Sequence, residues 1–159
     1  MNIITPTADG SNTLYNETIG EHYHSRHGAL QESKHVFINA GLKYAAQSFP
    51  DQPVAILEIG FGTGLNFLLS SAFAGEEGLN INYTGIEAYP LSKEELISTA
   101  YNQYVDEETW NRFIDHYEQA LTRGISLTAD QQLTIAHLKL EDFNSPVLFD
   151  LVYFDAFSV

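Results

Sequence analysis

This chain of 159 residues contains no cysteine and few basic residues. Without cysteine it forms neither disulfides nor thiolate zinc sites, which fits a reducing cytoplasm. Lys and Arg together number 7 against 21 Asp and Glu, so the formal net charge is −14. Because nucleic-acid binding draws most of its free energy from Lys and Arg at phosphates, an RNA-directed role needs a local basic patch or help from elsewhere.

Long hydrophobic runs are also missing. No apolar run approaches the ~20 residues that span a bilayer, and no charged region followed by an apolar one opens the chain. The sequence therefore predicts neither a membrane span nor a signal peptide, and it favours a soluble cytoplasmic protein. The length suits one domain with a sizeable core, and it leaves the oligomeric state open.

The stretch Leu57–Asn66 is the feature around which the rest of the chain is organised. It joins an apolar run to a segment with helical apolar spacing, and Gly60, Gly62 and Gly64 lie between them at alternate positions. Such a strand, tight turn and helix lets a ligand approach the backbone and offers it the free amides of the helix start. The pattern favours a nucleotide or nucleoside site over a purely structural glycine turn.

Periodicity and turn residues predict the remaining elements. We expect an N-terminal hairpin over residues 2–17 that turns at Asp9-Gly10, and a helix from Ala29 to Ser48. Strands are predicted over 54–59, 81–86 and 150–155, together with a β-rich region over 125–140. Gly75 and Gly78 mark a predicted loop, and a capping box is expected from Ser92 to Glu95. A helix with core aromatics is predicted over 107–121. Leu30, Phe37, Ala40, Gly41 and Tyr44 are expected on one side of the first helix.

This order predicts a doubly wound, mostly parallel α/β fold, whose ligands bind outside the carboxyl ends of the strands. We expect the last strand to be buried on both faces. Where a dinucleotide fingerprint has its third glycine, this chain has Leu65, which counts against NAD or FAD. Glu58, two residues before the first glycine, instead makes the turn resemble the first motif of class I S-adenosylmethionine-dependent methyltransferases.

Two later strand ends extend that resemblance. Glu87 follows the second strand, where an acid accepts both ribose hydroxyls, although a solvated strand-end carboxylate is the alternative. Asp142 is expected to end the third strand, where its carboxylate and the Phe143 amide would bind adenine; Glu141 could take that part, and helix capping is the alternative. With Asn66 at the helix start, these residues complete the expected cofactor set.

Three further stretches narrow the family. The first is Thr7-Ala8-Asp9-Gly10-Ser11 with Thr13-Leu14-Tyr15, the second is Glu21-His22-Tyr23-His24-Ser25 running into Gly28-Ala29-Leu30-Gln31-Glu32-Ser33, and the third is Tyr153-Phe154-Asp155-Ala156-Phe157-Ser158. They resemble the MnmC/MnmD-type tRNA methyltransferases. The resemblance implies a Rossmann-like fold and methylation of the 5-aminomethyl group on the tRNA wobble (2-thio)uridine from S-adenosylmethionine. It also implies cooperation with a separate flavin oxidase or with upstream tRNA-modifying enzymes, because the oxidase domain fused in some bacteria is absent here.

By that resemblance Asp155 lies nearest the chemistry, and Tyr23, Gln31 and Glu32 border the cofactor and the target amine. A carboxylate beside the amine would stabilise the positive charge that methyl transfer places there, although Asp155 could instead cap the turn after its strand. An ordinary Asp, with a pKa of ~3.9, is a weak base, which favours orientation and electrostatics as the role of Asp155. His22, His24, His27 and His35 match no metal motif, and we predict no metal site.

The resemblance also sets the expected domain limits. Residues 1–25 are an N-terminal hairpin extension, and residues 26–159 are the S-adenosylmethionine-binding domain. Because class I folds normally continue with further strands and this family usually has proline where Val159 stands, we expect C-terminal strands to be missing. Two other functions stay open: a small-molecule methyltransferase, which the acidic charge favours, and a non-catalytic cofactor-binding fragment.

Overall fold

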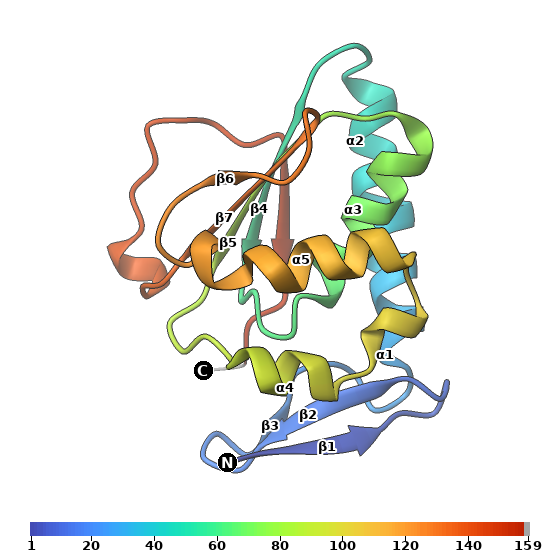
Figure 1. Ribbon diagram of the computed structural model, residues 1–159, viewed down its shortest axis with the longest axis vertical. Helices are drawn as coiled ribbons and strands as arrows, with labels where there is room; N and C mark the ends of the chain where they lie inside the picture. The colour runs from blue at the N-terminus through green and yellow to red at the C-terminus, as the bar shows by residue number, and fades with distance from the viewer. Residues whose placement is uncertain (158–159) are drawn as a thin grey trace.

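A five-stranded sheet forms the centre of the computed structural model, which describes residues 1–157 (Figure 1). The strand order is β6-β7-β5-β4-β8, with β4 at Val54–Ile59, β5 at Ile81–Ile86, β6 at Ile125–Ser126, β7 at Gln131–Ala136 and β8 at Leu151–Phe154. All neighbours are parallel except the short β6, which runs antiparallel to β7. The predicted mostly parallel, Rossmann-like α/β fold is confirmed. Ser158, in the last family motif, and Val159 lie outside the described residues.

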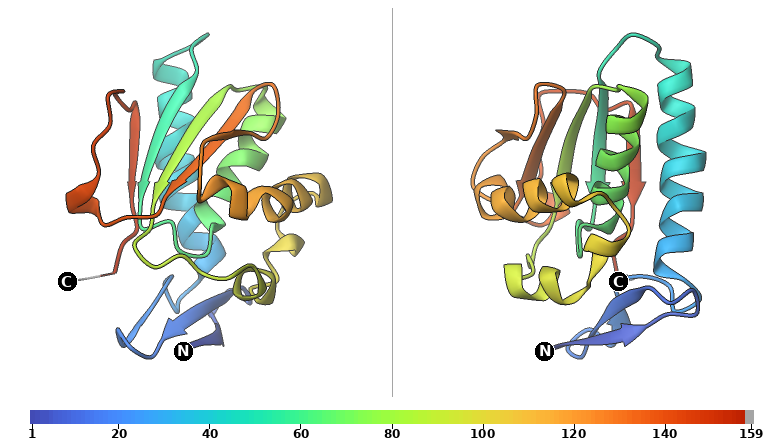
Figure 2. Two further views of the ribbon diagram at one scale, coloured as in Figure 1. Left: turned by 60° about the vertical axis from the view of Figure 1, so that its left-hand side comes forward. Right: turned by 45° about the vertical axis from the view of Figure 1, so that its right-hand side comes forward.

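Helices cover one face of this sheet, as Figure 2 shows. They are α3 (Leu65–Glu77), α5 (Glu107–Ala120) and a long helix made of α1 (Ala29–Glu32), η1 (Ser33–Leu42) and α2 (Lys43–Ser48). Rings from the sheet pack into them: Tyr83 lies 5.1 Å from Phe67 of α3, and Tyr153 lies 5.1 Å from Phe37 of η1, centroid to centroid. This face carries the core, because alternate strand residues point into it.

The other face is crossed by residues 137–150, which contain only the short η3 (Leu140–Asp142) (Figure 2). Val152 and Phe154 of β8 point to this side and are 54% and 66% exposed. The expectation that β8 is buried on both faces is therefore wrong. Among the described residues β8 pairs only with β4, so it is an edge strand of the sheet.

The long helix has the predicted bounds, but not entirely the predicted buried side. Phe37 is buried, whereas Tyr44 is 69% exposed and Ala40 also faces solvent. The middle ten residues form a π-helix, which turns less per residue than an α-helix, so positions seven apart drift off one face. Gly41 does pack inward: a Cβ there would lie 3.3 Å from the Tyr153 ring, so glycine lets the helix approach β8 closely.

The other predicted elements are largely confirmed. The capping box at α4 (Lys93–Ser98) is present, and the α5 aromatics Phe113 and Tyr117 are buried. Gly75 does not mark a loop, because α3 continues through it and ends at Gly78, whose φ is +66°. A short η2 (Tyr101–Gln103) precedes α5. Among the described residues no helix is both long and apolar enough to span a membrane.

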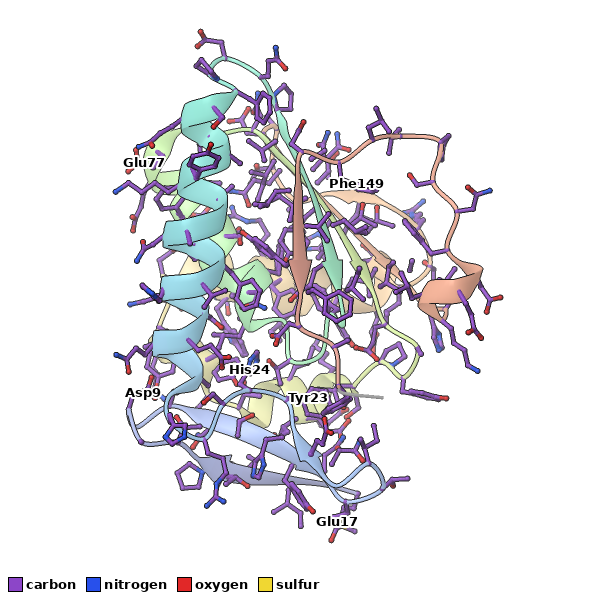
Figure 3. The ribbon with its side chains drawn as sticks, turned by 180° about the vertical axis from the view of Figure 1, so that it is seen from behind. Asp9, Glu17, Tyr23, His24, Glu77 and Phe149 are labelled. Atoms are coloured by element: carbon purple, nitrogen blue, oxygen red, sulfur yellow. The ribbon has the colours of Figure 1, made fainter. Side chains whose placement is uncertain are left out.

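The predicted hairpin is present and forms part of a small antiparallel sheet of β1 (Asn2–Pro6), β2 (Asn12–Asn16) and β3 (Glu21–His22). Its turn caps the long helix. The amides of Ala29, Leu30 and Gln31 donate to Thr7 Oγ1, Ser11 Oγ and Asp9 Oδ2, respectively. The first family motif thus supplies acceptors for a helix start that has no cap of its own, and Figure 3 shows Asp9 at that end of the helix.

Candidate active site

The glycine turn between β4 and α3 has positive φ at all three glycines: +86° at Gly60, +54° at Gly62 and +76° at Gly64. A Cβ atom added to any of them would clash with the protein. It would lie 2.7 Å from Ala156 Cα at Gly60, 2.9 Å from the Tyr23 ring at Gly62 and 2.7 Å from the Phe113 ring at Gly64. The glycines therefore serve first to bring the chain's own segments against the turn. Gly60 and Gly62 also line a cavity, so their backbone stays accessible to a ligand.

This cavity has a volume of about 740 Å³ and lies at the carboxyl ends of β4, β5 and β8. We call it the larger cavity, to distinguish it from a smaller one that also borders Asp155. The walls of the larger cavity include Ile59, Ile86, Tyr89, Leu138 and Phe154, together with Glu87, Tyr23 and Asp155. An apolar cavity of this size with a few polar groups is typical of small-molecule sites. It lies where a sheet of parallel strands normally binds its ligand.

Glu87 lies beside the glycine turn, as the sequence predicts for a residue after the second strand. Its Oε2 accepts a hydrogen bond from the Gly62 amide at 2.9 Å, and its Oε1 accepts one from the Tyr89 amide at 3.0 Å. The carboxylate thus holds the turn and the loop after β5 together at the cavity wall. Its predicted contact with ribose stays a prediction.

Asp142 does not end the third strand, so that expectation is wrong. β7 ends at Ala136, and Asp142 lies six residues later in η3, with its side chain exposed. The cavity wall after this strand is formed by Leu138, Lys139 and Leu140. The sequence pattern failed because the segment from Leu138 to Leu140 looks like a continuing strand but breaks its pairing. The predicted adenine contacts of Asp142 and Phe143 have no support in this geometry.

Asp155 follows β8 immediately, and its amide donates to the Ile59 carbonyl at 3.0 Å. Its Oδ2 accepts a hydrogen bond from Asn66 Nδ2 at 3.0 Å and lies 3.4 Å from Nδ1 of His24. The side chain is 20% exposed. It borders both the larger cavity and a smaller, polar one of about 310 Å³. Asp155 is therefore held in place and reaches two spaces at once.

The smaller cavity is lined mainly by the second family motif. Its walls are Glu21, His22, Tyr23, His24, Ser25, Arg26, Glu32, Asp155, Ala156 and Phe157. Tyr23 and Phe157 form an edge-to-face ring pair, with centroids 4.7 Å apart, and both line the two cavities. Figure 3 shows Tyr23 and His24 between the N-terminal sheet and the central sheet. Two spaces that share the Tyr23–Phe157 pair and Asp155 suit two reactants that meet.

Glu58 is not at either cavity surface. The residue is 1% exposed, and its carboxylate accepts hydrogen bonds from Asn66 Nδ2 at 2.9 Å and the Tyr83 hydroxyl at 2.6 Å and faces the helices. Burial raises its pKa well above the usual value of 4.5, and the negative charge of Asp155 adds to that shift. Because Asn66 donates to both carboxyls, Glu58 reaches Asp155 through Asn66 and lies behind the site.

Of the predicted substrate residues, the structure brings Tyr23 and Glu32 to the smaller cavity. Glu32 accepts a hydrogen bond from the Ser25 amide at 2.9 Å, which fixes the motif segment to the long helix. Gln31 is exposed and lines a third cavity on the outer side of that helix start, away from Asp155. Its predicted contact with the target amine is not supported by that position.

Sequence reasoning missed the pairing of His24 with Thr63. Nε2 of His24 lies 2.7 Å from Oγ1 of Thr63 in the glycine turn, while Nδ1 faces Asp155. Both residues are almost fully buried. The only signal in the sequence was the presence of His24 in a motif rich in polar aromatics. Within residues 1–157 no group of His, Asp and Glu side chains has a metal-binding arrangement.

The glycine turn, the parallel sheet and the cavity at its carboxyl edge define a Rossmann-like fold. Comparison with solved structures gives the same fold. MnmC2 from Aquifex aeolicus matches with a TM-score of 0.72 and 23% identity, over 99% of this chain and 50% of the other. No family model matches the sequence.

Curated relatives confirm the resemblance to MnmC/MnmD-type proteins. The bifunctional tRNA 5-methylaminomethyl-2-thiouridine biosynthesis protein MnmC of Acidovorax sp. (strain JS42) is 35% identical over 92 residues, covering 55% of this chain and 14% of the relative. The MnmC protein of Leptospira borgpetersenii (strain JB197) is 29% identical over 131 residues, covering 76% of this chain and 18% of the relative. The alignments thus span less than a fifth of these relatives' length.

Proposed function

We propose that this protein transfers a methyl group from S-adenosylmethionine to the 5-aminomethyl group of the tRNA wobble (2-thio)uridine. The observation that carries the proposal is the position of Asp155 between the two cavities, next to the glycine turn. The larger cavity is assigned to the cofactor and the smaller one to the amine. The MnmC names of the relatives supply the identity of the acceptor.

The residues present fit S-adenosylmethionine in three respects. The cavity volume suits a ligand of this size, and its apolar wall suits adenine. Glu87 offers carboxylate oxygens at the position where ribose hydroxyls are accepted. Asn66 is 1% exposed and lines neither cavity, so it holds Asp155 from behind and does not face the cofactor.

The chain's own residues then act on the amine. When bound, the cofactor would supply an electrophilic methyl group, whose bond to the sulfonium sulfur breaks as the amine lone pair forms the new N–C bond, so that S-adenosylhomocysteine leaves and the positive charge passes to the nitrogen. The carboxylate of Asp155 stabilises that charge and orients the amine. Asn66 and His24 hold Asp155 from two sides, which limits its rotamers. Tyr23 and Phe157 shield the meeting point of the two cavities from water.

The same proposal assigns residues 1–25 to an N-terminal extension and residues 26–159 to the methyltransferase domain. It places the protein in the cytoplasm, where it would act after enzymes that install the aminomethyl group on tRNA. A flavin oxidase would serve as a separate partner for tRNAs that carry a longer precursor.

The test is transfer of labelled methyl from S-adenosylmethionine to tRNA from a strain that accumulates the aminomethyl wobble uridine. We expect label in that nucleoside after digestion of the tRNA and none in tRNA that lacks the aminomethyl group. Small primary amines serve as competing acceptors. Label on the amines but not on the tRNA would instead support a small-molecule methyltransferase, which the net charge of −14 favours. Cofactor binding without any transfer would support a non-catalytic fragment.

A further inference from the structure

Three of the seven Lys and Arg residues lie in the segment 22–50, whose first residues line the smaller cavity. Between His22 and Pro50 the only acidic residue is Glu32, although the whole chain has 21. The same segment contains Arg26, Lys34 and Lys43 and four histidines. The segment therefore has far fewer acidic residues than the rest of this chain, and its first residues line the cavity that Asp155 borders.

Four of these side chains form a continuous exposed set, which we call the basic strip: Arg26, His27, Lys34 and His35. Arg26 lines the smaller cavity, and the other three line the third cavity, of about 810 Å³, along the start of the long helix. The two cavities share Ser25 and Glu32, so they adjoin each other. The basic strip therefore runs along the helix start and ends at the cavity that contains Asp155.

Two carboxylates near the basic strip are held by backbone amides and keep their places beside the helix start. Glu32 accepts the Ser25 amide, and both oxygens of Asp9 accept hydrogen bonds from the hairpin turn and the helix start. Glu21 and Asp155 line the smaller cavity itself. A carboxylate inside that cavity faces the amine, which is positively charged once methylated, while three of the four members of the basic strip lie outside it, along the third cavity. Carboxylates inside the cavity and basic residues beside it suit a substrate that carries a cationic amine on an anionic phosphate backbone.

We propose that the basic strip is the surface along which the RNA phosphate backbone lies while the target base enters the smaller cavity. This inference rests on the proposed function, because it takes tRNA as the substrate. With a net charge of −14, the chain repels RNA over most of its surface, so Arg26 and Lys34 next to the site give both affinity and orientation. The interactions with phosphate carry no sequence information; they position the strand.

The test is tRNA binding measured by fluorescence anisotropy over a series of salt concentrations. The double variant R26A/K34A removes two charges from the basic strip, and K93A/R123A removes two from elsewhere on the chain. At about 50 mM salt we expect R26A/K34A to bind tRNA about tenfold more weakly for each phosphate that it no longer neutralises, with a salt slope smaller by about one per phosphate. K93A/R123A should bind like the wild type. Unchanged thermal unfolding and S-adenosylmethionine binding show that R26A/K34A is folded.

Methyl transfer, measured in parallel, separates this inference from the proposed function. If the wild type methylates tRNA and R26A/K34A binds tRNA as well as K93A/R123A does, the basic strip is overturned and the function stands. If tRNA binds in a manner that depends on Arg26 and Lys34 but is never methylated, the basic strip is supported and the function fails. Absence of any salt-dependent tRNA binding by the wild type also overturns the basic strip.

Discussion

Nδ1 of His24 lies 3.4 Å from Oδ2 of Asp155, while Nε2 of the same ring lies 2.7 Å from Thr63 in the glycine turn. His24 thus links the residue nearest the proposed chemistry to the loop nearest the proposed cofactor. We expect His24→Ala to lower kcat on the order of 10²-fold, because a small misplacement of a reacting group costs that much. The dissociation constant for S-adenosylmethionine should change little. His24→Gln, which can still hydrogen-bond Thr63, should recover part of the rate; equal losses in kcat and in cofactor affinity would show a merely structural role.

Asp155 itself is expected to carry the larger effect. Asp155→Ala should lower turnover by roughly 10²- to 10³-fold, because the charge that develops on the amine loses its carboxylate. Isothermal titration should show that the cofactor still binds. Asp155→Asn keeps the size but not the charge, so it should be nearly as slow. Turnover equal to that of the wild type in either variant would remove Asp155 from its proposed role.

Glu87 is the residue to test for the cofactor. Glu87→Ala removes the acceptor for the Gly62 and Tyr89 amides and the proposed ribose contacts. Because hydrogen bonds to a charged group contribute about 1.5–3 kcal/mol, the dissociation constant for S-adenosylmethionine should rise about 10- to 100-fold. Glu94→Ala, on the exposed side of α4, is the matched control. If both variants bind the cofactor equally well, the proposed ribose contact is wrong.

Glu58 should make stability depend on pH. Burial raises its pKa well above 4.5 and the Asp155 charge raises it further, so the folded state favours the protonated form. Its contribution to the free energy of unfolding is therefore fully present below about pH 4.5 and is lost as the pH rises through the raised pKa. Glu58→Gln cannot ionise, so its free energy of unfolding should vary less with pH than that of the wild type above about pH 4.5. Urea unfolding at a series of pH values measures this, and identical slopes for the two proteins would contradict it.

Asp9 should stabilise the long helix, with the opposite dependence on pH. Burial alone would raise the pKa of its carboxyl, but hydrogen bonds from Ser11, Gln31 and Thr7 outweigh burial and lower the pKa to about 2. The stabilisation is thus present above pH 3.8 and is lost as the pH falls toward 2. Asp9→Ala should cost about 1–2 kcal/mol at neutral pH, as other helix caps do. Asp115→Ala, exposed on α5, should cost less than about 0.5 kcal/mol; equal costs would rule out the cap.

Local patterns in the sequence were enough to predict the strand, glycine turn and helix at Leu57–Asn66, and the order of strands and helices around them. They also place Glu87 and Asp155 at strand ends, because the point where an apolar run stops can be read from neighbouring residues. Asp142 shows the limit of that method. Its preceding segment keeps a strand-like composition after the pairing with β5 has ended, and pairing is not a local property.

Only the tertiary structure decided what lies around these residues. His24 and Thr63 are 39 positions apart, and nothing local to either one indicates that they meet at Asp155. The neighbours of the glycines, Ala156, Tyr23 and Phe113, likewise come from distant segments, as does the cap that Asp9 provides to the long helix. The sequence by itself determined which elements form and where their polar ends are. Packing of segments far apart in the chain determined which of those ends share a site, because such contacts depend on the whole fold.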